Sequence, residues 1–239
     1  MRAARVVSLV PSATETLVAL GVRPVGCTRF CDLAGVPTVG GTKNVDVDAV
    51  AALAPDLVIV NDEENRLEDA DALVARGLAL HSMSPRSVSD VGPAVCALAM
   101  AIGVEPPEPF DAWDAWQART STPERLSAFI PIWRRPWMSL AADTYGSSLL
   151  AHAGIANIFD DSVDRYPEVS LTEVAARAPD VVLLPSEPYA FAERHALELR
   201  ATVPGLRVSF VDGRDLFWWG TRTPAAAERL QSAHFQSAE

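Results

Sequence analysis

One stretch of this chain occurs twice. The segment VDVDAVAALAPD at 45–56 matches VSLTEVAARAPD at 169–180, 124 residues later, at seven of twelve positions. The alignment continues without a gap, because Val58 then meets Val182 and Glu63 meets Glu187 at the same offset. Such a long match at one fixed offset predicts two related structural units in a single chain.

Each copy of the repeat has the same order of local signals. An alanine-rich stretch typical of a short helix is followed by an Ala-Pro-Asp turn, because Pro55 and Pro179 cannot continue a helix. The apolar runs at 57–60 and 181–184 do not alternate with polar residues, which indicates strands that are covered on both faces. We therefore predict an α/β fold with two Rossmann-like lobes, each built on a parallel sheet.

The length of the chain fits this organisation. Its 239 residues are 49% hydrophobic, which is enough for two modest cores. We place an N-terminal α/β lobe at 1–86 and a C-terminal α/β lobe at 127–239. The segment 87–126 is predicted to be a helical connection between the lobes, with helices at 88–102 and 110–119.

Polar residues follow the apolar run of each copy. In an open α/β sheet the carboxyl ends of the strands are where ligands bind, so two such edges suggest a ligand cleft between the lobes. Acids also suit the first turn of a helix, and 61–66 is expected to lead into a helix that ends near Arg76. The acidic residues in question are Asp62, Glu63, Glu64 and Glu187.

Two further helix starts can be read from the sequence. Ser12 and Glu15 follow the strand at 6–10 with the spacing of a capping box, and the helix is expected to stop at Gly21. This turn serves either as a simple cap or as a cradle for a polar ligand group. In the second lobe, Asp143 is expected to cap the corresponding helix.

The charge of the chain excludes one class of partner. The formal net charge is -11 and the pI is near 4.8, and Lys43 is the single lysine. Because phosphate backbones require a basic surface, nucleic acid is not expected to bind.

The three cysteines do not form a recognised metal or redox motif. Cys27 and Cys31 have a C-x3-C spacing and Cys96 stands apart, so a structural role as small buried residues is expected. The first strand begins near Arg5, which leaves no room for a signal peptide, and no run reaches the length of a membrane span. As the sequence stands we predict a soluble cytoplasmic protein, or a periplasmic or extracytoplasmic one if the N-terminus is truncated.

The sequence contains no catalytic motif that we recognise. The histidines are scattered, and there is no H-E-x-x-H, G-x-S-x-G or Walker sequence. We therefore predict a protein that is not an enzyme, with no catalytic residue, no metal ligand and no built-in cofactor.

Aromatic and arginine residues gather where strands are expected to end. Flat rings with a few fixed hydrogen-bonding groups suit a large planar or macrocyclic ligand, and guanidinium groups suit its carboxylates or phosphates. Some of these rings are expected to fill the cores instead. The candidates for the ligand wall are Arg29, Phe30, Trp137, Tyr166, Tyr189 and Trp218.

Several motifs resemble one known family. They are VSLVPSATETLVALG at 7–21, GCTRFCD at 26–32, VGGT at 39–42, PDLVIVNDEENR at 55–66, WRRPWM at 133–138, RYPEV at 165–169 and LLPSEPY at 183–189. In this order they resemble the helical-backbone, or class III, periplasmic binding proteins, the substrate-binding proteins of cobalamin and iron-siderophore ABC importers. The opening motif is most similar to that of the cobalamin-binding members, and the resemblance covers nearly the whole chain.

The resemblance implies a monomer of two α/β lobes joined by a long rigid helix, with a corrinoid or another metal chelate held between aromatic side chains. It also implies that an acidic residue on each lobe docks onto arginines of an ABC permease, and Glu63, Glu64 and Glu187 lie near such positions. The Pro-rich segment 105–109 departs from the family, because it interrupts the connecting helix.

Two alternatives remain open at this point. A ferric siderophore or haem would be recognised chiefly by the arginines. A cytoplasmic enzyme or metal-trafficking factor could reuse the fold with a polar centre at 62–64 and Arg134.

Overall fold

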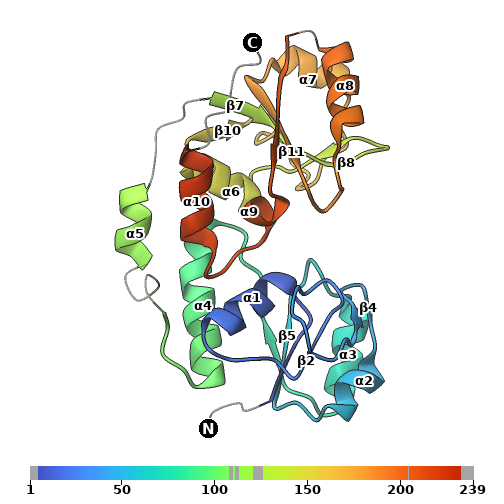
Figure 1. Ribbon diagram of the computed structural model, residues 1–239, viewed down its shortest axis with the longest axis vertical. Coiled ribbons are helices and arrows are strands. Elements are labelled where there is room, and N and C mark those ends of the chain that lie inside the picture. The colour runs from blue at the N-terminus through green and yellow to red at the C-terminus, as the bar shows by residue number, and fades with distance from the viewer. Residues whose placement is uncertain (1–4, 108–109, 111–112, 121–125, 204, 233–239) are drawn as a thin grey trace. The chain divides into compact units, whose positions relative to one another are not determined.

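The computed structural model describes residues 5–107, 110, 113–120, 126–203 and 205–232. The chain divides into two compact units, each with its own sheet (Figure 1). Unit 1 comprises Met1–Pro85, Ser89–Asp114 and Trp219–Arg222. Unit 2 comprises Arg86–Val88, Ala115–Trp218 and Thr223–Glu239. Residues of the predicted connection at 87–126 contribute to both units.

The sheet of unit 1 has four parallel strands in the order β2-β1-β5-β6. The chain runs from β1 to β2 on one side and then returns past β1 to β5, so right-handed connections place the first helix on one face and the next two on the other. In Figure 1, α1 lies on one side of this sheet, and α2 and α3 lie on the other side. The bounds are β1 Val6–Ser8, α1 Pro11–Ala19, β2 Gly26–Cys27, α2 Val47–Ala52, β5 Leu57–Val60, α3 Leu67–Ala75 and β6 Leu80–Ser82.

The sheet of unit 2 repeats this topology. Its four parallel strands stand in the order β10-β7-β11-β12, so that β7 takes the place of β1 and β11 that of β5. The predicted α/β class with one parallel sheet in each lobe is confirmed. The bounds are β7 Leu126–Phe129, α6 Tyr145–His152, β10 Ile155–Asn157, α7 Leu171–Arg177, β11 Val181–Pro185, α8 Glu193–Thr202 and β12 Arg207–Val211.

The remaining described elements are short hairpins and additional helices. Strands β3 and β4 pair antiparallel in unit 1, and β8 and β9 do so in unit 2. Their bounds are β3 Gly40–Gly41, β4 Asn44–Val45, β8 Pro131–Trp133 and β9 Met138–Ser139, and the helices are α4 Val88–Ile102, α5 Trp113–Thr120, α9 Gly213–Phe217 and α10 Thr223–Ser232.

The sequence repeat corresponds to a repeat in structure. Helices α2 and α7 and strands β5 and β11 start 124 residues apart. In the Ala-Pro-Asp turns, Ala54 and Ala178 both have left-handed backbones, with φ of 43° and 47°. The aspartate of each turn then accepts a hydrogen bond from a backbone amide at the start of the first sheet strand of its unit. The Asp56 carboxylate accepts from the Arg5 amide at 2.9 Å, and the Asp180 carboxylate accepts from the Ser127 amide at 2.6 Å.

The left-handed alanine of the second turn makes a stabilising substitution possible. The left-handed region costs an L-residue about 1–2 kcal/mol, whereas glycine adopts it freely but loses about 0.4–1 kcal/mol through the greater entropy of its unfolded chain. Ala178→Gly is therefore expected to raise the free energy of unfolding by about 0.5–1 kcal/mol, measured by urea denaturation. Ala176→Gly is the control, because Ala176 is an exposed residue inside α7 and glycine there costs about 0.5–1 kcal/mol. If both substitutions changed the free energy of unfolding in the same direction, the strained left-handed backbone of Ala178 would be contradicted.

Each unit has its own apolar core. The core of unit 1 contains valines and leucines of β1, β5, α2 and α3, and that of unit 2 contains rings and aliphatic side chains of β7, β11, α7 and α8. In α4, Gly92 leaves room for an aromatic ring, because a Cβ at this residue would lie 2.3 Å from Cγ of Trp113. This contact explains a glycine inside a helix, where it would otherwise be unfavourable.

Two predicted helix caps were wrong, whereas the helix predicted to follow 61–66 and to end near Arg76 is present as α3. Helix α1 begins at Pro11 after the N-cap residue Val10, with no side-chain cap, because a proline in the first turn has the helical φ and needs no amide donor. Ser12 is therefore buried inside the first turn. The N-cap of α6 is Thr144 and not Asp143, since the Thr144 hydroxyl accepts from the Ser147 amide at 3.3 Å. Helix α3 begins at Leu67, so 62–64 precede its first turn.

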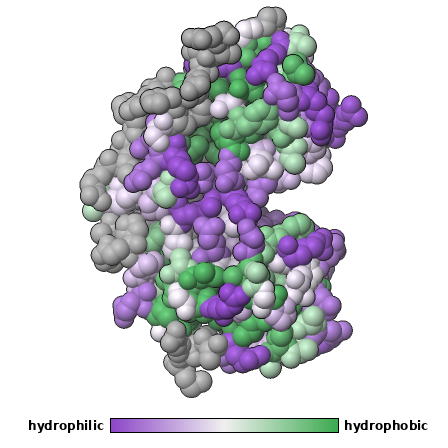
Figure 2. Space-filling view, in the orientation of Figure 1, coloured by the Kyte–Doolittle hydropathy of each residue, from purple (hydrophilic) through white to green (hydrophobic). Residues whose placement is uncertain are grey.

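In the view of Figure 2, hydrophobic and hydrophilic areas occur side by side on the described surface of each unit. No helix among the described residues is both long and apolar enough to span a membrane.

Candidate ligand-binding and docking residues

The strand order identifies one edge of each sheet as a candidate site. In the order β2-β1-β5-β6, strand β2 is added on one side of β1 and strands β5 and β6 are added on the other side. The position between β1 and β5 is therefore a topological switch point. In open α/β sheets, ligands bind beyond the carboxyl ends of the strands at such a point. The equivalent point of unit 2 lies between β7 and β11. The loops that follow β5 and β11 carry the acidic residues singled out in the sequence.

Two buried asparagines organise the loop after β5. The Asn61 side chain donates to the Met83 carbonyl at 2.7 Å and accepts from the amides of Glu63 and Glu64 at 2.7 and 3.0 Å. The Asn65 side chain accepts from the Asn61 amide at 2.9 Å, and its amide group donates to two carbonyls, those of residue 9 at 3.3 Å and residue 42 at 3.0 Å. These bonds attach the loop after β5 to three other segments of unit 1.

The acidic turn that results is ordered but not part of a helix. Asp62 is exposed, and Glu63 and Glu64 are half-buried. The Lys43 ammonium donates to the Glu63 carbonyl. Sequence reasoning recognised the acids but missed Asn61 and Asn65, whose spacing of four residues within NDEEN was the available signal.

Arg29 and Phe30 lie together in the turn that follows β2. The Arg29 amide donates to the Gly40 carbonyl at 2.9 Å, and its guanidinium carbon lies 4.7 Å from the centre of the Phe30 ring. Gly41 gives the guanidinium room, since a Cβ at that residue would lie 3.0 Å from it. Phe30 is 52% exposed, so its ring contributes little to the core of unit 1.

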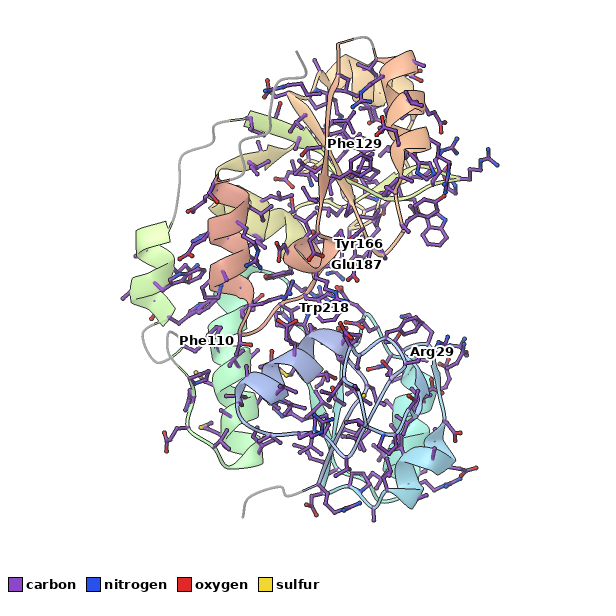
Figure 3. The ribbon with its side chains drawn as sticks, viewed as in Figure 1. Arg29, Phe110, Phe129, Tyr166, Glu187 and Trp218 are labelled. Carbon is purple, nitrogen blue, oxygen red and sulfur yellow. The ribbon has the colours of Figure 1, made fainter. Side chains whose placement is uncertain are left out.

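Glu187 and Trp218 are direct partners in unit 2. The Trp218 indole N–H donates to Oε1 of Glu187 at 2.6 Å, and the Arg214 guanidinium lies 4.9 Å from the Trp218 ring centre. Figure 3 shows both labelled side chains beside α9. A Cβ on Gly213 would lie 2.5 Å from Cγ of Glu187, so the glycine allows Glu187 to pack against the start of this helix. The carboxylate is thus fixed in position.

Tyr166 belongs to a second polar group of unit 2. The Arg165 guanidinium lies 5.5 Å from the Tyr166 ring centre, and its Nε donates to the Asp143 carbonyl at 2.6 Å. The Asp143 carboxylate also pairs with Arg86 at 3.2 Å. Tyr166 is 39% exposed. Sequence reasoning found the arginine and the tyrosine but assigned Asp143 to a helix cap and did not single out Arg86.

Tyr189 and Trp137 belong to a cluster of rings. Trp137 is 8% exposed and stacks on Phe191 with ring centres 5.9 Å apart, so most of its surface serves the core of unit 2. Tyr189 is half-buried and contacts Trp133 edge to face at 5.3 Å. Its hydroxyl lies 3.3 Å from Nε2 of the buried His195.

The surroundings of His195 favour its neutral form. Its Nδ1 accepts from the Ala192 amide at 2.9 Å, which caps the first turn of α8. Burial lowers the pKa of His195, and the positive charges of Arg194 and Arg134 lower it further. This histidine therefore orients Tyr189 without adding a charge, a role that sequence reasoning missed.

The structure brings some of the predicted residues into contact within a unit. Arg29 contacts Phe30, and Glu187 contacts Trp218. Among the residues that the structure describes, no group of three or more histidine, cysteine, aspartate and glutamate side chains could hold a metal ion. The ligand-binding and docking roles of these residues stay predictions.

Comparison with known proteins supports the resemblance seen in the motifs. No family model matches the chain. The chain is 24% identical over 254 residues to the vitamin B12-binding protein of Vibrio parahaemolyticus, and the match covers 98% of this chain and 90% of the relative.

Solved structures show the same fold. The periplasmic vitamin B12 binding protein BtuF of Vibrio cholerae has a TM-score of 0.77 at 21% identity and covers 96% of both chains. The periplasmic heme-binding protein RhuT from Roseiflexus sp. RS-1 has a TM-score of 0.78 at 22% identity, covering 98% of this chain and 99% of that one. The predicted class III substrate-binding fold is confirmed, and so is the resemblance to the cobalamin-binding members of that class.

Proposed function

We propose that this chain, which has the fold of the class III substrate-binding proteins, binds a corrinoid or a closely related metal chelate and is the solute-binding component of an ABC importer or a relative of one. The observation that carries the proposal is the match to a vitamin B12-binding protein over 98% of this chain and 90% of the relative. A match of nearly full length includes the loops at the ends of the strands as well as the core.

The side chains proposed to contact the ligand come from both units. Phe30, Tyr166 and Trp218 retain exposed or half-buried rings, and each lies against an arginine. Aromatic rings suit the apolar flank of a macrocycle, and the guanidinium groups suit its polar side groups. Tyr189 would contribute its ring edge, oriented by His195. Arg29 is proposed as the polar contact of unit 1, and Trp137 chiefly supports the loop that carries Arg134.

Partner docking is assigned to the acidic loops. We propose that Glu187, and Glu63 or Glu64 in the related loop, present carboxylates to a basic permease surface. The bond from Trp218 to Glu187 supports this assignment, because a fixed carboxylate loses less side-chain entropy on docking. In the related loop the amides of Glu63 and Glu64 donate to the Asn61 side chain, which fixes the backbone of the acidic turn. We further propose a monomeric protein without enzymatic activity.

A heme is the second candidate ligand. RhuT, which matches 98% of this chain, is described as a heme-binding protein. Corrin and porphyrin are both large, flat metal macrocycles, so aromatic residues would serve either one. A heme carries two propionates, and we expect it to depend more strongly on Arg29 and Arg165 than a corrinoid does.

The test is a titration of the purified full-length protein. Cyanocobalamin, aquocobalamin and heme are added separately, and binding is followed by visible absorbance and by quenching of tryptophan fluorescence. Saturable binding of a corrinoid with a dissociation constant of about 1 µM or below, and weaker binding of heme, is expected. Preference for heme would support the second candidate. Binding of neither would overturn both and favour the enzyme or metal-trafficking alternative.

A matched pair of substitutions tests the proposed wall. Phe30→Ala removes a ring that is 52% exposed and is expected to weaken corrinoid binding by about threefold to tenfold, since an aromatic contact contributes about 0.5–1.5 kcal/mol. Phe210→Ala is the control, because Phe210 is 49% exposed but lies in β12 and outside the proposed site. Affinity is measured by the same titration, with thermal unfolding to check the fold. Equal affinities of the two variants would remove Phe30 from the site.

A further inference from the structure

Two of the three cysteines lie side by side in unit 1. Cys27 ends β2 and is 2% exposed, and Cys31 follows the Arg29–Phe30 turn and is 9% exposed. Both are free thiols. The turn between them is closed by a bond from the Cys31 amide to the Thr28 carbonyl at 3.1 Å. The two thiols are therefore close enough for each to shift the pKa of the other.

Hydrogen-bond donors converge on the sulfur of Cys31. The hydroxyl oxygens of Thr14 and Thr28 lie 3.1 and 3.3 Å from it, and both threonines are buried. The Cys27 thiol and the backbone of Thr28 also lower the pKa of the Cys31 thiol. The Thr14 hydroxyl has an alternative acceptor in a helix carbonyl at 3.0 Å, but a charged sulfur attracts its hydrogen more strongly than a neutral oxygen.

This arrangement divides the two thiols between two roles. The converging donors stabilise the thiolate, and the pKa of Cys31 is lowered to about 6. The pKa of Cys27 is raised, because its thiol proton is held by the neighbouring sulfur and its burial disfavours charge. At neutral pH one sulfur is a thiolate nucleophile and the other keeps its proton, the arrangement expected of an attacking and a resolving cysteine.

We propose that Cys27 and Cys31 form a redox-active dithiol that hydroperoxides oxidise to a disulfide across the Arg29–Phe30 turn. The Cys31 thiolate attacks the peroxide oxygen, forming a sulfenic acid and releasing hydroxide. The Cys27 thiol then attacks the Cys31 sulfur, the S–S bond forms, the S–O bond breaks, and the thiol proton leaves with the oxygen as water. In total, two thiols and one hydrogen peroxide give one disulfide and two waters.

A metal site fits these residues less well. A structural zinc site requires four ligands, commonly cysteine and histidine. Within the described part of the chain, no third histidine, cysteine, aspartate or glutamate completes a cluster with this pair. The disulfide, by contrast, needs only the two sulfurs and a short turn, and both are present.

The experiment uses the full-length protein with Cys96→Ser, so that only the pair can react. The reduced protein is treated with an equimolar amount of hydrogen peroxide and digested with trypsin without reduction. Trypsin cuts after Arg29, so the peptides carrying Cys27 and Cys31 remain joined only if the disulfide has formed. The expected result is a joined pair lighter by two hydrogen atoms, which dithiothreitol separates. Unjoined peptides from folded, peroxide-treated protein would overturn the proposal.

Two sets of variants test the roles. In Cys27→Ser, oxidation is expected to stop at the Cys31 sulfenic acid, which dimedone labels. Absence of the label would contradict the assignment of Cys31 as nucleophile.

Thr14→Val is expected to slow oxidation about threefold to tenfold, because one stabilising donor is lost. Thr16→Val is the matched control on the same helix, since the Thr16 hydroxyl bonds to the Ser12 carbonyl and not to sulfur. Equal rates in the two threonine variants, with circular dichroism showing both folded, would exclude the hydroxyl contribution.

Discussion

Phe129→Ala is expected to lower the free energy of unfolding of unit 2 by about 3–5 kcal/mol, the range for a phenylalanine removed from a packed core. Phe129 ends β7 and is fully buried, and Figure 3 shows it among the strands of its unit. Its ring meets Phe159 edge to face at 5.8 Å and Trp137 at 6.4 Å. Removing it leaves a cavity bounded by rigid rings, which cannot close around an alanine.

The measurement is urea denaturation followed by tryptophan fluorescence and far-ultraviolet circular dichroism. Phe210→Ala provides the control, because the same atoms are removed from a side chain that is 49% exposed. Its cost is expected to remain below about 1 kcal/mol. If the two variants lost similar stability, Phe129 would not be at the centre of the core.

The second large effect concerns Gly220. Its φ is +121°, a conformation that L-residues rarely adopt, and a Cβ there would lie 2.1 Å from Oγ1 of Thr16. Gly220→Ala is therefore expected to cost unit 1 about 3 kcal/mol, through backbone strain together with overpacking. Thermal and urea unfolding of unit 1 would measure the loss.

A control and a double-mutant cycle separate the two causes. Gly77 also has a positive φ, of +77°, but nothing lies within 4 Å of its Cβ position, so Gly77→Ala is expected to cost only about 1–2 kcal/mol. In a Thr16→Ala background the clash at Gly220 is removed, and the cost of Gly220→Ala is expected to fall by at least about 1 kcal/mol. A cost independent of residue 16 would show that the close contact contributes nothing.

Much of the fold could be predicted from the repeat. The matching segments predicted two parallel sheets because a covered strand needs apolar residues on both faces, and this constraint is local to the sequence. The left-handed Ala54 and Ala178 could not be predicted, because alanine does not favour that conformation and only the tertiary contacts of the turn impose it. The hydrogen bonds that Asp56 and Asp180 accept could not be predicted either, because their donors lie about 50 residues away in the sequence.

The candidate site could be predicted only in part. Residue type and position after a strand were sufficient to select Phe30 and Glu187, which lie in loops at strand ends. They were not sufficient to separate Trp137, which is mostly buried, from Trp218, because burial depends on what packs across the sheet. The acids at 62–64 suited either a loop or the first turn of the helix that follows. The Asn61 side chain bonds to the amides of Glu63 and Glu64, and the acids lie in a turn before α3.

The segment Trp219–Arg222 completes unit 1 although it follows most of unit 2 in the sequence. It belongs to unit 1, where the Thr221 amide bonds to the Thr16 hydroxyl at 3.4 Å and Arg222 pairs with Glu15 at 2.8 Å, yet it is encoded after almost all of unit 2. During synthesis the N-terminal half therefore emerges before residues 219–222, and helix α1 lacks the contacts of Glu15 and Thr16 with this segment until it has been made. The first unit to leave the ribosome thus gains these contacts only after most of unit 2 has been synthesised.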